Sequence, residues 1–210
     1  MIFGFLLFQD VEELDFIGPW EIIGMWSKSF GGPEQCLLIS QTGEIITCAK
    51  GLKVIPHTSF ENCPPLDYLL IPGGQGTRKE VDNKDLIAFV NKQGVSCRQI
   101  LSVCTGSFIL HAAGFLKGKK ATTHWRSLER LRQLSDVTVV EQRFVQDGNI
   151  WTAAGVSAGI DLALALIADQ AGEDIAGKVQ LAVEYYPNQL RYGNIHLGTE
   201  TPAYLRESQT

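Results

Sequence analysis

The sequence predicts one α/β domain of three layers, in which helices cover both faces of a mostly parallel central sheet. Apolar, β-rich runs alternate with helix-like segments, and strands that are apolar throughout are typical of a sheet buried on both faces. A chain of 210 residues, 45% of them hydrophobic, has the size of one domain. Residues 102–110, SVCTGSFIL, place Cys104 between such a strand and a helix, the arrangement of a nucleophile elbow.

The elements follow one another in a regular order. Strands of the central sheet are expected at residues 2–8, 36–40, 68–71, 99–103 and 137–140, and helices at 19–27, 84–93, 107–113, 126–134, 156–172 and 176–185. Alternating polar and apolar side chains at residues 43–54 and 143–152 predict two antiparallel ribbons attached to this sheet; the second turns at Asp147-Gly148. The domain is expected to span residues 1–186, with an irregular C-terminal tail at 187–210.

Composition and charge argue against several classes of function. The formal net charge is −5 and the one dense basic cluster, residues 117–120, is short, so no nucleic-acid partner is expected. The apolar start MIFGFLLFQD lacks the basic region and cleavage site of a signal peptide, and the other apolar runs are too short to cross a membrane. We therefore expect a cytoplasmic protein with no membrane partner.

The cysteines and histidines do not predict a metal centre. The five cysteines include no Cys-x-x-Cys pair, and no histidine lies at ligand spacing from a second ligand. We expect no disulfide framework, no metal and no cofactor. Cys36, Cys48 and Cys97 are interpreted as small buried hydrophobic residues.

Cys104 differs from the other cysteines in its position. The carboxyl ends of strands in an open α/β sheet face the ligand cleft, and Gly106 would permit a tight turn there. The positive end of the following helix is expected to lower the pKa of the thiol. Cys104 is therefore the candidate nucleophile, and a buried cysteine that only ends a core strand is the alternative.

The glycine-rich stretch PGGQGT, residues 72–77, follows another predicted strand. Taken alone it indicates an ordinary β-turn. Beside a nucleophilic cysteine it becomes a candidate half of an oxyanion hole, with the Gly74 and Thr105 N–H groups as the two donors.

Five motifs together resemble one known family. They are LDFIGPWEI (14–22), LLIPGGQG (69–76), SVCTGSFIL (102–110), GKKATTHW (118–125) and TAAGVSAGIDLAL (152–164). In this order they resemble the ThiJ/PfpI superfamily, which has a flavodoxin-like, class I glutamine amidotransferase-like fold. Within the superfamily the chain looks most like the isonitrile hydratase branch, which has an aspartate in the first motif and a threonine after the cysteine.

The resemblance implies a function and a set of site residues. It implies a homodimer that hydrates small apolar isonitriles to N-substituted formamides, with Cys104 as nucleophile, Asp15 as general acid and base, and Thr105 beside them. Burial near a thiolate is expected to raise the pKa of Asp15. The substrate pocket would include the Val156 backbone, His124 and an aromatic wall. The candidates for that wall are Trp125 and Trp20.

Several alternatives stay open at this point. Asp15 could be a helix-capping carboxylate before Gly18-Pro19, and His124 a purely structural residue. The same cysteine could serve a glyoxalase or deglycase, but these use Glu or His beside the thiol, and Thr105 stands where protease-like members have His. A redox sensor based on Cys104, and a ligand-sensing domain of a transcriptional regulator, are further options. The sequence shows no helix-turn-helix after residue 185, which disfavours the regulator.

Overall fold

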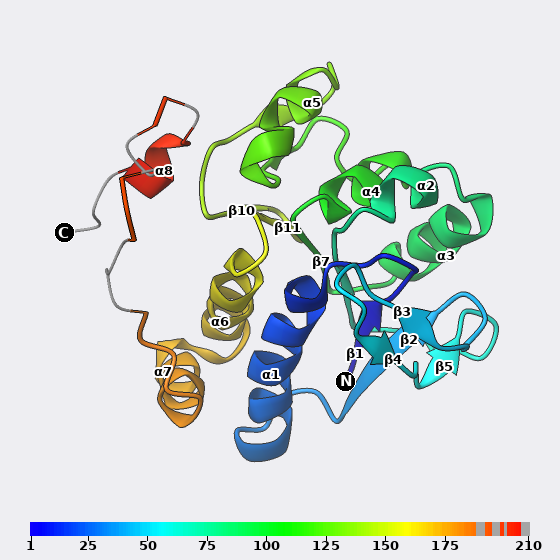
Figure 1. The fold of residues 1–210 in the computed structure, drawn as a ribbon. Coiled ribbons are helices and arrows are strands. Elements are labelled where there is room, and N and C mark those ends of the chain that lie inside the picture. The colour runs from blue at the N-terminus through cyan, green and yellow to red at the C-terminus, as the bar shows by residue number, and fades with distance from the viewer. Residues whose placement is uncertain (188–191, 195–197, 200, 207–210) are drawn as a thin grey trace.

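The computed structural model describes residues 1–187, 192–194, 198–199 and 201–206. Its centre is a seven-stranded sheet in the order β10-β11-β7-β6-β1-β2-β5, parallel throughout except for the antiparallel pair β10–β11 (Figure 1). The strands are β1 (Ile2–Leu6), β2 (Gln35–Ser40), β5 (Thr58–Ser59), β6 (Tyr68–Ile71), β7 (Gln99–Val103), β10 (Phe144–Asp147) and β11 (Ile150–Ala153). The predicted α/β class and parallel sheet are confirmed.

Helices form the two outer layers (Figure 1). On one face α1 (Glu13–Ser29) packs against α6 (Ala158–Ala171), which in turn packs against α7 (Glu173–Ala182). The other face carries α2 (Thr77–Glu80), α3 (Lys84–Gly94) and α4 (Gly106–Ala112). A 3-10 turn (Trp125–Ser127) leads into α5 (Leu128–Arg132), and α8 (Ala203–Arg206) lies in the tail. The core is the apolar filling between these layers, with β1, β6 and β7 almost fully buried.

The strand predicted at residues 137–140 is not part of the central sheet. Only Thr138–Val139 form a strand, β9, which pairs in parallel with β8 (Lys120–Ala121) as a separate two-stranded sheet. β11, which is predicted as half of a ribbon attached to the sheet, joins the central sheet by pairing in parallel with β7. The ribbon itself is confirmed, and Gly148 takes the left-handed φ of 66° that its turn requires.

The other predicted ribbon also forms but stays apart from the main sheet. It consists of β3 (Ile46–Thr47) and β4 (Lys53–Val54), which pair antiparallel with each other in a sheet of two strands. Its backbone is tied to the segment before α1, because Ala49 N–H donates to the Val11 carbonyl at 2.8 Å. The ribbon is thereby held beside the start of α1.

Helix α1 begins six residues earlier than Pro19, where the sequence predicted its start. Pro19 lies inside the helix and has no N–H to give to the carbonyl of Asp15, four residues before it. Asp15 therefore lies in the first turn of α1 and not in a loop before the helix. Glycines let α1 and α6 approach closely: a Cβ on Gly159 would lie 2.8 Å from Pro19 Cγ, and one on Gly18 would lie 2.8 Å from Ile160 Cγ1.

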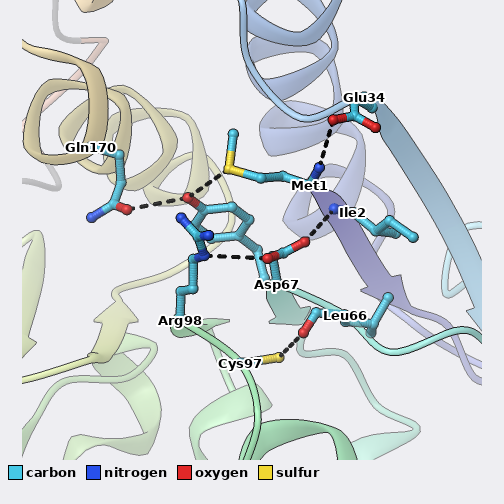
Figure 2. A network of polar contacts seen from close by, with 9 residues as sticks. Met1, Ile2, Glu34, Leu66, Asp67, Cys97, Arg98 and Gln170 are labelled. Carbon is cyan, nitrogen blue, oxygen red and sulfur yellow. Dashed lines mark hydrogen bonds and ion pairs between the residues drawn. The ribbon is translucent and has the colours of Figure 1, made fainter.

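A polar network joins strands β1, β6 and β7 at their amino ends (Figure 2). Asp67 Oδ2 accepts the Ile2 N–H at 2.8 Å, and its Oδ1 pairs with Arg98 Nε at 3.2 Å. The Tyr68 hydroxyl, just inside the same edge, donates to Gln170 Oε1 on α6 at 3.2 Å. This end of the sheet is opposite to the end that carries Cys104.

Only part of the predicted irregular tail lies within the described residues. There, Pro202 is buried and Tyr204 packs against the core. The division of the chain at residue 186 stays a prediction.

Candidate active site

Cys104 lies at a sharp turn between β7 and α4. Its φ is 57°, in the left-handed region that non-glycine residues rarely adopt. Two residues on, a Cβ on Gly106 would lie 2.2 Å from the Ile71 carbonyl oxygen, so only glycine fits. Hydrogen bonds hold the turn from both sides: Cys104 N–H donates to the Ala154 carbonyl at 2.9 Å, and Thr123 Oγ1 donates to the Cys104 carbonyl at 2.8 Å. The nucleophile elbow is present as predicted.

Asp15 is fully buried in the first turn of α1. Its Oδ2 accepts the Gly73 N–H at 2.8 Å, and its Oδ1 has no hydrogen-bond partner among the described residues. The pKa of Asp15 is raised to about 8, chiefly by burial and also by the nearby Glu12 charge, and this rise outweighs the lowering effect of the Gly73 N–H and of Cys104. The carboxyl group is therefore mostly protonated at neutral pH, and Oδ1 is the oxygen free to carry the proton.

The Cys104 thiol is close enough to Asp15 for each to affect the other's pKa. Burial first, and then the Asp15 charge, raise the pKa of Cys104, while the backbone N–H groups of Thr105 and Val156 lower it. The expected low thiol pKa is therefore wrong, because the end of a seven-residue helix does not offset burial of a side chain that is only 6% exposed. Thiol and carboxyl form a buried pair that favours holding protons.

The glycine-rich loop approaches this pair, but not through the predicted residue. The Gly74 N–H donates to Thr105 Oγ1 at 3.1 Å, so it is engaged by a side chain and not presented to a ligand. Gly73 instead gives its N–H to Asp15, and a Cβ on it would lie 2.9 Å from Asp15 Oδ2 and 2.5 Å from Thr105 N. Of the two predicted donors, only the Thr105 N–H lowers the pKa of the Cys104 thiol, and the other backbone N–H that lowers it is that of Val156.

The Thr105 hydroxyl holds the glycine loop to the elbow. Besides the Gly74 N–H it contacts Thr77 Oγ1 at 3.1 Å, and it also lowers the pKa of the Cys104 thiol. Thr77 is buried and donates to the Gly74 carbonyl at 2.7 Å. The sequence patterns did not single out Gly73, Thr77 or Thr123. A glycine two residues after a strand and threonines in apolar surroundings were the only signals available for them.

Val156 and His124 flank the elbow, as the resemblance implies. Val156, between β11 and α6, has a φ of 47°, which is strained for a β-branched residue. The His124 ring packs on the adjacent glycine: a Cβ on Gly155 would lie 2.3 Å from His124 Cδ2. Burial and the Arg126 charge lower the pKa of His124, which favours the neutral imidazole. His124 Nδ1 accepts the Arg126 N–H at 3.2 Å, and its ring lies 5.8 Å from that of Trp125.

Trp20 does not join this group. Its ring stacks on His57, with the centroids 5.7 Å apart, and meets Phe5 edge-on. It lines a separate cavity of about 460 Å³ together with Cys36 and Met25, and none of Asp15, Cys104 or Val156 lines that cavity. The assignment of Trp20 to the substrate pocket is corrected, because α1 directs Trp20 toward the outer strands of the sheet.

Charged residues lie near the buried Asp15, and the charges of Glu12 and Lys50 affect its pKa. Lys50, from the β3–β4 ribbon, pairs with Glu12, and its Nζ lies 3.7 Å from Glu13 Oε2.

Among the residues the structure describes, no group of three or more His, Cys, Asp or Glu side chains could hold a metal ion. In the same part of the chain, no helix is both long and apolar enough to span a membrane.

The fold and the site together define a class of protein: an α/β domain with a cysteine at a nucleophile elbow and a buried carboxyl group beside it. The pattern of the DJ-1/PfpI family matches residues 3–169, which is most of the chain. The chain belongs to the DJ-1/PfpI family.

Individual relatives differ in what their names record. The isonitrile hydratase of Pseudomonas putida is 40% identical over 184 residues, which are 88% of this chain and 78% of the hydratase. The HTH-type transcriptional regulator GbdR of Pseudomonas aeruginosa is 28% identical over 179 residues, 84% of this chain but only 48% of the regulator.

Solved structures agree with the family assignment. A ThiJ/PfpI family protein from Pseudomonas syringae has a TM-score of 0.82 and 33% identity, and the match covers 89% of this chain and 76% of that protein. Drosophila melanogaster DJ-1beta has a TM-score of 0.76 at 19% identity, with 89% and 98% of the two chains covered. The second likeness shows the fold alone.

Proposed function

We propose that this protein is an isonitrile hydratase-like lyase, with Cys104 as its nucleophile and Asp15 as its general acid and base. The observation that carries the proposal is the buried carboxyl group of Asp15, whose pKa is raised to about 8 beside the thiol. A carboxylic acid that stays protonated near neutral pH can deliver a proton to a carbon that the sulfur attacks. The similarity to the Pseudomonas putida isonitrile hydratase supports the same assignment.

The first step joins the sulfur to the terminal carbon of the isonitrile. The Cys104 thiol first loses its proton to solvent. Its sulfur then forms the C–S bond as the thiolate, and Asp15 gives its own proton to the same carbon, which produces a thioimidate and an ionised Asp15. The Thr105 and Val156 N–H groups, which favour the thiolate form of Cys104, support the attacking state.

The second step consumes one water molecule. Its hydroxyl adds to the carbon of the thioimidate, and its proton reaches the nitrogen through Asp15. The C–S bond then breaks, the hydroxyl proton returns to Asp15, and the N-substituted formamide leaves. The thiolate and the protonated carboxyl group are both restored, so the cycle needs no cofactor.

The test offers the protein a panel of alkyl and aryl isonitriles and monitors formamide formation by ultraviolet absorbance. Cys104→Ala and Asp15→Asn are expected to lose turnover. Cys97→Ala is the matched control, because Cys97 is 7% exposed and Cys104 6% exposed, while Cys97 lies before the amino end of β7. Absence of turnover on the whole panel, or turnover that survives Cys104→Ala, contradicts the proposal.

Two alternatives within the family fit the site less well. A glyoxalase or deglycase needs Glu or His beside the thiol; here Asp15 takes that place, and His124 Nδ1 accepts a backbone N–H. A redox sensor needs an exposed thiol of low pKa, whereas Cys104 is buried and its pKa is raised. Mass spectrometry after mild peroxide separates the sensor from the hydratase, because only the sensor requires selective oxidation of Cys104.

We propose further that the protein acts in the cytoplasm as a homodimer on small apolar substrates. All five cysteines are free, which suits a reducing compartment. Leu14 and Ile17 leave an apolar surface on α1, 38% and 37% exposed, that a second subunit could cover. Light scattering after gel filtration tests the oligomeric state, and a monomeric mass contradicts this part of the proposal.

A further inference from the structure

The segment between β11 and α6, residues 154–157, carries a group that acts on the nucleophile. The Val156 N–H favours the thiolate form of Cys104, and the Ala154 carbonyl accepts the Cys104 N–H at 2.9 Å. Val156 makes its contribution from a left-handed backbone conformation, with a φ of 47°. Such a conformation in a β-branched residue persists only when its surroundings hold it in place.

Arg143, just before β10, contacts this segment at both ends. Its carbonyl accepts the Ala154 N–H at 2.9 Å, and its Nη2 donates to Ser157 Oγ at 2.9 Å. Its Nε also pairs with Asp161 Oδ2 at 2.7 Å, in the first turn of α6. One guanidinium group therefore ties the strained segment to the helix that follows it.

Ser157 shows that this contact replaces a more common one. It is the N-cap residue of α6, where a serine hydroxyl usually accepts an N–H from the first helical turn. Here its side chain makes no such capping bond and meets Arg143 instead. The other carboxylate oxygen of Asp161 accepts the Tyr185 hydroxyl at 3.1 Å, which holds Asp161 in line with Arg143.

We infer that Arg143 is a positioning residue for the Cys104 site: it clamps residues 154–157 through Ser157 and Asp161, and so keeps this segment in place against Cys104. The inference rests on the function proposed above. Among the hydrogen bonds of the described residues, none joins the Arg143, Ser157 or Asp161 side chain to Cys104, so we expect their effect to reach it through the backbone of this segment. A displacement of about 1 Å at such a group can cost on the order of 100-fold in rate.

The first test is Arg143→Met, which keeps an unbranched apolar side chain and removes the clamp. The matched control is Lys119→Met, because the Lys119–Asp147 pair is 35% and 28% exposed and the Arg143–Asp161 pair 30% and 28%. We expect kcat for isonitrile hydration to fall by about tenfold or more in Arg143→Met, with KM changed less than about threefold. Lys119→Met should retain the kcat of the parent protein.

Conservative variants separate positioning from folding. Lysine can pair with Asp161 but lacks the planar fork that also reaches Ser157, so Arg143→Lys should recover kcat only in part. Circular dichroism and thermal unfolding of each variant give the folded fraction at the assay temperature. An unchanged kcat in Arg143→Met, an equal loss in Lys119→Met, a loss explained by the unfolded fraction, or full recovery with lysine would overturn the inference.

A readout without substrate keeps this inference distinct from the proposed function. Cys104 is alkylated with iodoacetamide at pH 8, and the reaction is monitored by intact mass. Its rate reports on stabilisation of the thiolate. We expect the alkylation rate of Arg143→Met to be lower than that of Lys119→Met by about threefold or more. If alkylation is slower in Arg143→Met but the parent protein hydrates no isonitrile, the result supports the Arg143 clamp and contradicts the proposed hydratase function. An equal or faster rate in Arg143→Met contradicts the clamp.

Discussion

At the scale of single residues, the site depends on backbone conformations that the residue types at these positions do not predict. Cys104 and Val156 both have positive φ although neither is glycine, and they lie on two different segments that meet at the sulfur. Only the surrounding hydrogen bonds and packing sustain such conformations. The motif around Cys104 was sufficient to predict its position, because strand, cysteine and Gly106 are contiguous in the chain.

The roles of other site residues could not be read in the same way. A run such as PGGQGT indicates that backbone N–H groups will be available, but not which of them faces the ligand. That choice depends on the backbone conformation. Gly74 has a φ of 126° and its N–H donates to Thr105 Oγ1, whereas the N–H of Gly73 donates to Asp15. The thiol pKa was mispredicted for a related reason, since burial by distant segments is not visible in a local motif.

Asp15 should make the protein less stable as pH rises. Its folded-state pKa is about 8 against an ordinary 3.8, so its contribution to stability is complete below pH 3.8 and is lost progressively as pH rises to about 8. Asp15→Asn cannot ionise. We expect it to raise the free energy of unfolding at pH 8 by about 1–4 kcal/mol while activity is lost.

Denaturant unfolding of both proteins from pH 4 to pH 9 checks this expectation. The difference between Asp15→Asn and the parent protein should grow with pH and level off above about pH 8. A variant that is less stable than its parent at pH 8, or a difference that does not vary with pH, would show that the buried carboxyl group is not the source of the slope.

Thr105 should matter through its hydroxyl group. Thr105→Val keeps the shape of the side chain but leaves the Gly74 N–H and the Thr77 hydroxyl without this partner. We expect a loss of about 1–3 kcal/mol in the free energy of unfolding, together with lower kcat, because unpaired buried groups are costly. Thr105→Ser, which keeps the hydroxyl, should stay close to the parent protein in both measurements; equal loss in the two variants would assign the effect to the methyl group.

At the scale of elements, buried strands and most helices were predictable, and two errors have physical causes. Proline favours the first turn of a helix, yet Pro19 lies inside α1, and the helix continues because tertiary packing outweighs one missing hydrogen bond. Alternating polarity correctly indicated the β10–β11 ribbon. It did not show that β11 also pairs with β7, because that pairing depends on contacts about 50 residues apart, such as Trp151 with Leu101.

The contact between α1 and α6 should be sensitive to a single methyl group. A Cβ on Gly159 would meet Pro19 Cγ at 2.8 Å and Val103 Cγ2 at 3.0 Å, so Gly159→Ala should lower the free energy of unfolding by about 1–3 kcal/mol. Gly177→Ala in α7 meets nothing within 4 Å and should raise it by up to about 1 kcal/mol. Both changes add the same methyl group inside a helix. Equal effects in thermal unfolding would therefore rule out close packing as the cause.

At the scale of the whole molecule, the proposed active site and a stabilising polar network lie at opposite ends of one sheet. The carboxyl ends of β6 and β7 lead to the glycine loop and to Cys104. The amino ends carry the network of Figure 2, in which Asp67 joins the backbone of β1 to Arg98. Mutations at the amino end should therefore change stability without changing catalysis.

Asp67 offers the sharpest test of this division. Asp67→Ala removes the acceptor of the Ile2 N–H and the partner of Arg98, and we expect a loss of about 1–3 kcal/mol in the free energy of unfolding. Asp67→Asn keeps an acceptor for Ile2 and loses only the pair with Arg98, whose side chain is 61% exposed, so its loss should stay below about 1 kcal/mol. In both variants kcat and KM, measured on the folded protein, should equal those of the parent. A fall in kcat as large as that expected for Arg143→Met would show that the two ends of the sheet are coupled.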